Sequence, residues 1–135
     1  MAEIKIFNPD GLARPAGTYT HIALAKAQQV VFIAGQVPMD ASGATIGKDN
    51  FDAQCVQVYA NIHTALRAVE ADWKNVVQFT SFLVRPQDAA TFRAYRGREF
   101  PNMFPDSAYP PNTLLIISRL ADPDYLLEVQ TIAAL

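Results

Sequence analysis

The sequence predicts one α+β domain, residues 1–135, in which two helices cover one face of a mixed β-sheet. Three observations support this fold class. Several segments rich in β-branched and aromatic residues have the length of strands, two others repeat apolar residues at helical spacings, and the elements follow the order strand–strand–strand–helix–strand–helix–strand–strand. A chain of 135 residues, 50% of them hydrophobic, can bury a sizeable core and leaves no room for a second domain.

The first three predicted strands lie in the amino-terminal part of the chain. Residues 4–7 alternate in polarity, and a dense turn signal, Asn-Pro-Asp-Gly, follows at residues 8–11. Residues 18–24 form the second strand. Residues 29–34 form an apolar run that ends at Gly35, which is typical of a buried strand. We expect the second and third strands to pair as a hairpin.

Two helices are predicted from the spacing of apolar side chains. The first begins at Asp49 or Asn50, either of which can cap a helix, and runs to about Asp72, where we expect Trp73 to pack. The second covers residues 88–101, and a central strand at residues 75–84 separates the two helices. The apolar stripe of the second helix consists of Phe92, Tyr95 and Phe100. We expect its charged residues to be mostly solvated, and these are Arg93, Arg96, Arg98 and Glu99.

The carboxy-terminal third is predicted to be two strands joined by a turn. Residues 112–118 and 125–132 are rich in β-branched residues, and Ala-Asp-Pro-Asp at residues 121–124 supplies turn chemistry, so we expect a hairpin. Glu128 does not fit a buried strand. Side chains alternate between the two faces of a strand, so Glu128 shares its face with Gln130. Either this face is open to water, or a carboxylate stands at a cleft.

Composition excludes several classes of function. The net charge of −2 gives no general attraction to nucleic acid, and no local basic patch is visible. Residues 1–5 lack the apolar core of a signal peptide, and no apolar run reaches the roughly 20 residues of a membrane span, so we expect a cytoplasmic protein. The single Cys55 cannot form an internal disulfide, and His21 and His63 are far apart in sequence. We therefore expect no metal, and no nucleic-acid or membrane partner.

Five short segments, taken together with the spacing between them, give the chain a resemblance to the Rid (YjgF) family of small cytoplasmic proteins. They extend over nearly the whole chain and are Gly17-Thr18-Tyr19-Thr20-His21, Ala34-Gly35-Gln36-Val37-Pro38, residues 76–83, Ser118-Arg119-Leu120 and Leu127-Glu128-Val129. The resemblance implies a chorismate-mutase-like α+β fold assembled as a homotrimer. In that assembly the sheets line the interior, the helices lie outside, and three small-molecule clefts form between subunits.

The resemblance also implies an activity and a set of site residues. The best-known activity of the family is the hydrolysis of reactive enamines and imines, such as 2-aminoacrylate, to 2-keto acids and ammonia, without a cofactor. Glu128 matches the acidic cleft residue, which would orient or deprotonate the attacking water and return the proton to the leaving nitrogen. Tyr19 also matches a cleft residue and could hydrogen-bond ligand or water, and the backbone N–H of Gly35 could bind a ligand oxygen, although packing and strand termination explain these two residues equally well.

One departure from the family concerns the substrate carboxylate. In the deaminating members, the segment aligned with residues 110–113 carries an arginine clamp where this chain has Asn112, beside Thr113. Asparagine donates a hydrogen bond but offers neither the charge nor the bidentate geometry of arginine. Losing this charge-assisted pair costs about 1.5–3 kcal/mol of binding free energy. Arg93 stands where these relatives tend to have asparagine. It either supplies a positive charge from another wall of the cleft or is a solvated residue of the helix.

Two functions from different classes remain open at this point. The first is a cofactor-free deaminase or hydrolase acting on a small imine or related metabolite, with Glu128 as the acid–base residue. The second is a non-catalytic trimer that binds a small ligand in the same cleft, and the absence of arginine at Asn112 favours it. A ribonuclease is a weaker third hypothesis, because the chain is acidic and lacks a pair of histidines for phosphodiester chemistry.

Overall fold

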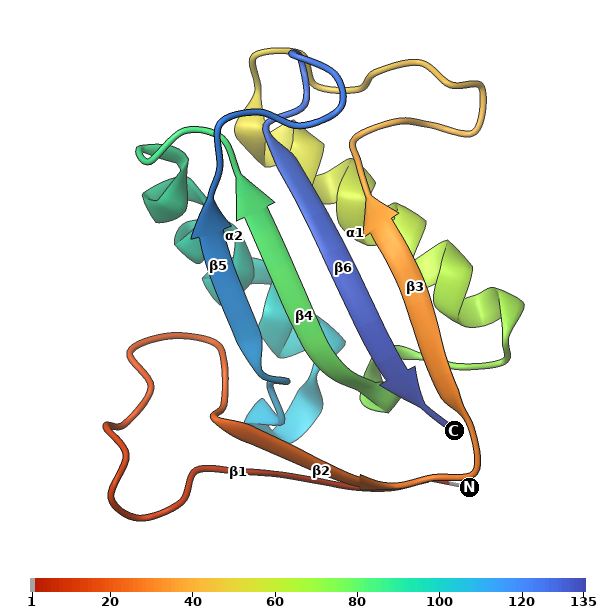
Figure 1. The fold of residues 1–135 in the computed structure, drawn as a ribbon, viewed down its shortest axis with the longest axis vertical. Helices are drawn as coiled ribbons and strands as arrows, with labels where there is room; N and C mark the ends of the chain where they lie inside the picture. Colours follow the sequence, from red (N-terminus) through yellow and green to blue (C-terminus); the bar gives the residue numbers. More distant parts are fainter. Residues whose placement is uncertain (1) are drawn as a thin grey trace.

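The computed structural model describes residues 2–135 and has the predicted α+β architecture (Figure 1). In chain order, the strands, the α-helices and two short 3-10 turns are β1 (Glu3–Phe7), β2 (Ile22–Lys26), β3 (Val30–Gln36), α1 (Phe51–Ala68), η1 (Trp73–Asn75), β4 (Val76–Leu83), α2 (Asp88–Met103), η2 (Pro105–Ser107), β5 (Asn112–Ile116) and β6 (Leu127–Ala134). Every predicted strand and helix is therefore present, with changes at the ends.

The main sheet has four strands in the order β3-β6-β4-β5, and both α-helices lie behind it in the view of Figure 1. Strand β4 runs parallel to β5 and antiparallel to β6, and β3 is antiparallel to β6. Strands β1 and β2 form a separate antiparallel pair. The sheet is therefore mixed, as the sequence predicts.

Both hairpins expected from the sequence are wrong. Strand β2 pairs with β1, and the short connection to β3 is bonded to the carboxy-terminal end instead, since the N–H groups of Gln28 and Gln29 both donate to the carbonyl oxygen of Leu135. Strand β4 lies between β5 and β6. The connection at residues 117–126 is long enough to carry the chain past the end of β4, so β6 enters the sheet where it pairs on both sides.

Helix α1 begins at the predicted cap and ends four residues before the predicted end. The Asn50 side chain accepts a hydrogen bond from the Ala53 N–H at 3.0 Å. The chain leaves the helix through Glu70, whose φ is 59°, and the Asp72 side chain caps the 3-10 turn at Trp73 instead. The Trp73 ring packs on the His63 ring of α1 at a centroid distance of 5.1 Å, so its expected position at the helix end is confirmed.

Helix α2 has the predicted apolar stripe and one unexpected buried charge. Phe92, Tyr95 and Phe100 are buried. Arg96, which is expected from the sequence to be mostly solvated, is only 7% exposed. That expectation is wrong because Arg96 follows Phe92 by four residues and Tyr95 by one, so it belongs to the buried face of the helix.

The two faces of the main sheet have different environments. The face toward the helices forms the core with fully buried residues such as Phe79, Leu127 and Val129. On the other face, Val30 is 56% and Phe32 is 74% exposed, so in the isolated chain β3 is not the buried strand that its sequence predicts. Across residues 2–135, no helix is long and apolar enough to cross a membrane.

Candidate functional site

Apart from Thr113, the site residues singled out by sequence fall into two separate pockets. One, the Glu128 pocket, has a volume of about 280 Å³ and is lined by Gly35, Phe82, Ile117, Leu120, Glu128 and Gln130. The other, the Arg96 pocket, has a volume of about 300 Å³ and is lined by Ala16, Gly17, Tyr19, Ala89, Arg93, Arg96, Asn112 and Leu114. No lining residue is common to the two pockets.

Glu128 lies in the middle of β6, opposite Phe82 of β4, and its side chain is half-buried. Burial raises the pKa of its carboxyl group above the usual value, and no hydrogen bond or opposite charge among residues 2–135 offsets this effect. A carboxyl group with a raised pKa is better suited to exchange protons near neutrality than an ordinary surface glutamate.

Gly35 provides the space that the Glu128 carboxyl group occupies. The pairing of β3 with β6 shifts register between Ile33 and Gln36, which places Gly35 in an irregular part of the strand. A methyl group at Gly35 would lie 2.7 Å from the Glu128 carboxyl carbon, closer than real side chains approach. The absence of a side chain at Gly35 therefore provides room for this position of the Glu128 carboxyl group.

The Arg96 pocket combines residues from three elements. Tyr19 comes from the segment before β2, Arg93 and Arg96 come from α2, and Asn112 begins β5. The Asn112 side-chain oxygen accepts a hydrogen bond from the fully buried Ser81 hydroxyl at 2.7 Å. This bond orients the amide so that its NH₂ group remains available as a donor. Thr113 is exposed on the opposite face of β5 and lines neither pocket.

Arg96 has an environment that is unusual for a guanidinium group. Its Cζ atom lies 4.5 Å from the centre of the Phe92 ring, and its Nε and Nη1 atoms are buried without a hydrogen-bond partner among the described residues. Burial lowers the pKa of Arg96, and the neighbouring charge of Arg93 lowers it further. Sequence reasoning missed this residue, although its spacing from Phe92 is the signal that identifies it.

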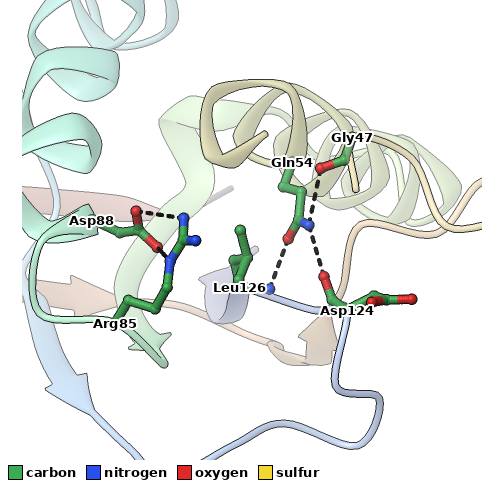
Figure 2. Close-up of polar contacts among 6 residues, drawn as sticks. All are labelled: Gly47, Gln54, Arg85, Asp88, Asp124 and Leu126. Atoms are coloured by element: carbon green, nitrogen blue, oxygen red, sulfur yellow. Dashed lines mark hydrogen bonds and ion pairs between the residues drawn. The ribbon is translucent and has the colours of Figure 1, made fainter. Parts of the chain in front are cut away.

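Gln54 is a second residue that sequence reasoning missed, and it fixes the strand that carries Glu128 (Figure 2). Its side chain is fully buried in α1. The amide nitrogen donates to the carbonyl oxygens of Gly47 at 3.1 Å and Asp124 at 2.9 Å, and the amide oxygen accepts from the Leu126 N–H at 2.8 Å. The start of β6 is thereby held against α1.

A buried acid fixes the start of α2 in a similar way. Asp88 is 5% exposed and accepts two hydrogen bonds from Arg85, at 2.7 and 2.9 Å, as Figure 2 shows. This bidentate pair lies in the first turn of the helix that carries Arg93 and Arg96.

Within residues 2–135, no group of three or more His, Cys, Asp or Glu residues could hold a metal ion.

Cys55 is fully buried in α1, and burial raises the pKa of its thiol far above the usual value. A buried thiol of this kind has little thiolate to act as a nucleophile.

The comparison with known proteins decides the family. The model of the family described as endoribonuclease L-PSP matches residues 11–135. This chain belongs to the Rid (YjgF) family. A RutC family protein of Pyrococcus horikoshii is 30% identical over 120 residues, which cover 89% of each chain. A RutC family protein of Pyrococcus abyssi is 29% identical over 133 residues, which cover 98% of each chain.

Solved structures of Rid proteins have the same fold. The Rid family protein YyfB of Yersinia pestis has a TM-score of 0.87 and 26% identity, with 98% of each chain covered. RidA of an Antarctic Psychrobacter has a TM-score of 0.69 and 23% identity, with 97% of this chain and 99% of that chain covered. The Rid-type α+β fold expected from the sequence is confirmed.

Proposed function

We propose that this Rid protein is a cofactor-free hydrolase that converts a small imine or enamine to a carbonyl compound and ammonia. Glu128 is the proposed acid–base residue, and Gly35, Tyr19, Arg93, Asn112 and Thr113 are the proposed substrate-binding residues. The observation that carries this proposal is the Glu128 carboxyl group, which is half-buried, unpaired among the described residues and raised in pKa inside a pocket. The Rid family includes enamine and imine deaminases, which is consistent with such a group.

The proposed active form is a homotrimer of single-domain chains. The face of the sheet that no helix covers exposes Val30, Phe32 and Leu115, and association would remove this apolar surface from water. The Glu128 pocket opens on this same face. We propose that the Glu128 pocket of one subunit adjoins the Arg96 pocket of the next, so that a cleft between subunits combines a proton-transfer group with positive charges.

The proposed reaction needs only water and a group that moves protons. Glu128 takes a proton from water as the water oxygen bonds to the carbon of the protonated imine, and the electron pair of the C=N bond moves to the nitrogen, which becomes a neutral amine. Glu128 then returns the proton to this nitrogen, and the carbon–nitrogen bond breaks with its electron pair leaving on ammonia. The hydroxyl proton passes to water as the carbonyl forms. A raised pKa keeps the donor and acceptor forms of Glu128 closer in energy near neutral pH than in an ordinary carboxylate.

A non-catalytic binding protein is the second candidate, and Asn112 is the observation that favours it. The Asn112 amide carries no charge, and its oxygen is already bonded to Ser81. A cleft without the arginine of the deaminating members would bind a carboxylate more weakly by about 1.5–3 kcal/mol unless another cation replaces it.

Release of ammonia from freshly generated 2-iminobutanoate tests the proposal. The wild-type protein should accelerate hydrolysis over buffer, and Glu128→Gln should abolish the acceleration while the variant stays folded. Glu3→Gln, which changes an exposed carboxylate in β1, is the matched control and should retain full activity. A wild-type protein that is no faster than buffer, while it still binds 2-oxobutanoate, would replace the hydrolase with the binding protein.

A further inference from the structure

Arg96 is a buried cation with no anionic partner among residues 2–135. It is only 7% exposed, and burying a charge is unfavourable unless an opposite charge or hydrogen-bond acceptors replace the lost water. Its Nε and Nη1 atoms have neither among residues 2–135. The contact with the Phe92 ring supplies a cation–π interaction but no hydrogen-bond acceptor for Nε or Nη1.

The acidic residues of the adjacent helical turns are bonded to other arginines. Asp88 forms the bidentate pair with Arg85, and Arg98 binds both Asp52 at 2.9 Å and Glu99 at 3.1 Å. The groups that influence the titration of Arg96 are Tyr59, Arg93, Cys55 and Tyr19, and none of them is a carboxylate. Among the described residues, Arg96 is therefore without an ion pair, while Arg85 and Arg98 are paired.

The surroundings of Arg96 favour an anion from outside the chain. Arg93, one turn earlier on α2, lines the same pocket and adds a second positive charge, whose repulsion with Arg96 an anion would relieve. The Tyr19 hydroxyl and the Asn112 NH₂ group are further donors on other walls. With a volume of about 300 Å³, the pocket is large enough for a small metabolite.

We propose that the Arg96 pocket binds a small carboxylate anion and that Arg96 is the residue that pairs with the carboxylate. A planar guanidinium matches the two oxygens of a carboxylate, and a guanidinium that is buried and already in contact with the Phe92 ring loses less entropy on binding. The assignment rests on the proposed function in so far as the carboxylate belongs to the imine substrate or its 2-keto acid product. In that case the positive charge that pairs with the carboxylate comes from Arg96 of α2, because Asn112 of β5 carries no charge.

Calorimetric titration with sodium 2-oxobutanoate at low chloride concentration tests the assignment. The wild-type protein should bind, and Arg96→Met, which keeps an unbranched apolar stem on Phe92, should weaken binding at least tenfold. Arg93→Met should weaken binding less, by a few-fold, because the Arg93 side chain is exposed. Arg98→Met is the matched control and should bind as the wild type does, because Arg98 is bonded to Asp52 and Glu99 and lines neither pocket.

A measurement on the wild-type protein covers the case in which Arg96→Met does not fold. In NMR spectra, one arginine Nε–Hε resonance should remain present in Arg93→Met and Arg98→Met. This resonance should shift when 2-oxobutanoate is added. Unchanged affinity in a folded Arg96→Met variant, or the absence of such a shift, overturns the assignment. Binding of inorganic phosphate without binding of 2-oxobutanoate overturns the choice of a carboxylate.

The same titration separates this inference from the proposed function. Glu128→Gln should bind 2-oxobutanoate while it releases no ammonia from 2-iminobutanoate. Binding that depends on Arg96 in a protein without any turnover would retain the anion site and remove the hydrolase. Turnover that depends on Glu128, together with affinity unaffected by Arg96→Met, would retain the hydrolase and remove the anion site.

Discussion

The two faces of the main sheet differ in whether their side chains are buried and hydrogen-bonded within the chain. On the face toward the helices, Phe79 is 1% exposed, and the buried amide of Gln54 makes all of its hydrogen bonds within the chain. On the open face, Phe32 is 74% exposed, and Glu128 has no partner among the described residues. The first face accounts for the folding of one chain. The second has groups suited to contact with other molecules.

The largest expected effect concerns the open face. Phe32→Asp should convert a trimer of about 44 kDa, three times the chain mass of 14.8 kDa, into single chains, because a charge at Phe32 could not be buried between subunits. Light scattering at micromolar concentration measures this change. Val56→Asp, on the outer surface of α1 where Val56 is 55% exposed, should stay trimeric. A wild-type protein that is a stable monomer would contradict both the assembly and the proposed cleft.

The next effect concerns the covered face. Gln54→Leu should reduce the free energy of unfolding by about 2–4 kcal/mol, because it leaves the Leu126 N–H and the carbonyl groups of Gly47 and Asp124 without their partner. Denaturant unfolding at fixed protein concentration measures the change. Gln57→Leu, at a partly exposed position of the same helix, should cost less than about 1 kcal/mol. Equal losses in the two variants would show that the buried hydrogen bonds of Gln54 stabilise the fold no more than the contacts of the partly exposed Gln57 do.

A smaller effect is expected where the Arg96 pocket meets the edge strand β5. Asn112→Arg should change the rate of 2-iminobutanoate hydrolysis by less than about threefold, because it adds a third positive charge to a pocket that Arg93 and Arg96 already line. In an Arg96→Met background, the same change should raise the rate about tenfold by restoring a charged partner. A ten- to hundredfold gain from Asn112→Arg alone would show that no existing arginine binds the carboxylate.

The smallest effect is the pH dependence of stability due to Glu128. Burial raises its pKa in the folded state above the value of 4.5 for a free side chain, so the folded state binds this proton more tightly than the unfolded state does. Its contribution to stability is complete below about pH 4.5 and is lost as the pH rises through the folded-state pKa. Relative to the wild type, Glu128→Gln should therefore gain stability between pH 4 and pH 7. Denaturant unfolding at the two pH values measures this, and a relative loss would contradict the sign.

Local patterns in the sequence predict the elements well and their pairing poorly. The apolar spacing of α2 and the cap at Asn50 depend on neighbouring residues, and the structure confirms both. The hairpins failed because strand pairing depends on the sheet as a whole, in which β6 lies between β3 and β4. A strand that pairs on both sides and one that ends a hairpin have the same local pattern.

The candidate site was predictable to a similar degree. Glu128 is recognisable as a charge in an apolar strand, and its raised pKa agrees with a partly buried position. The environment of Arg96 depends on which acids its neighbours bind, and residues such as Asp52 and Asp88 are paired through contacts that no local pattern specifies. The sequence also could not show that Gly35 and Glu128 lie apart from Tyr19 and Asn112 in one chain.

The position of β6 has a consequence for the order of events during protein synthesis. Strand β6 pairs with both β3 and β4, and its residues Leu127 and Val129 belong to the core. A chain in which β6 has not yet paired can form α1, α2 and the parallel pair of β4 and β5 but leaves a gap at the centre of the sheet. Until residues 127–134 join the sheet, β3 has no neighbour and one side of β4 is unpaired and open to other chains. Chaperone dependence should accordingly be greatest at the end of synthesis, before β6 has joined the sheet.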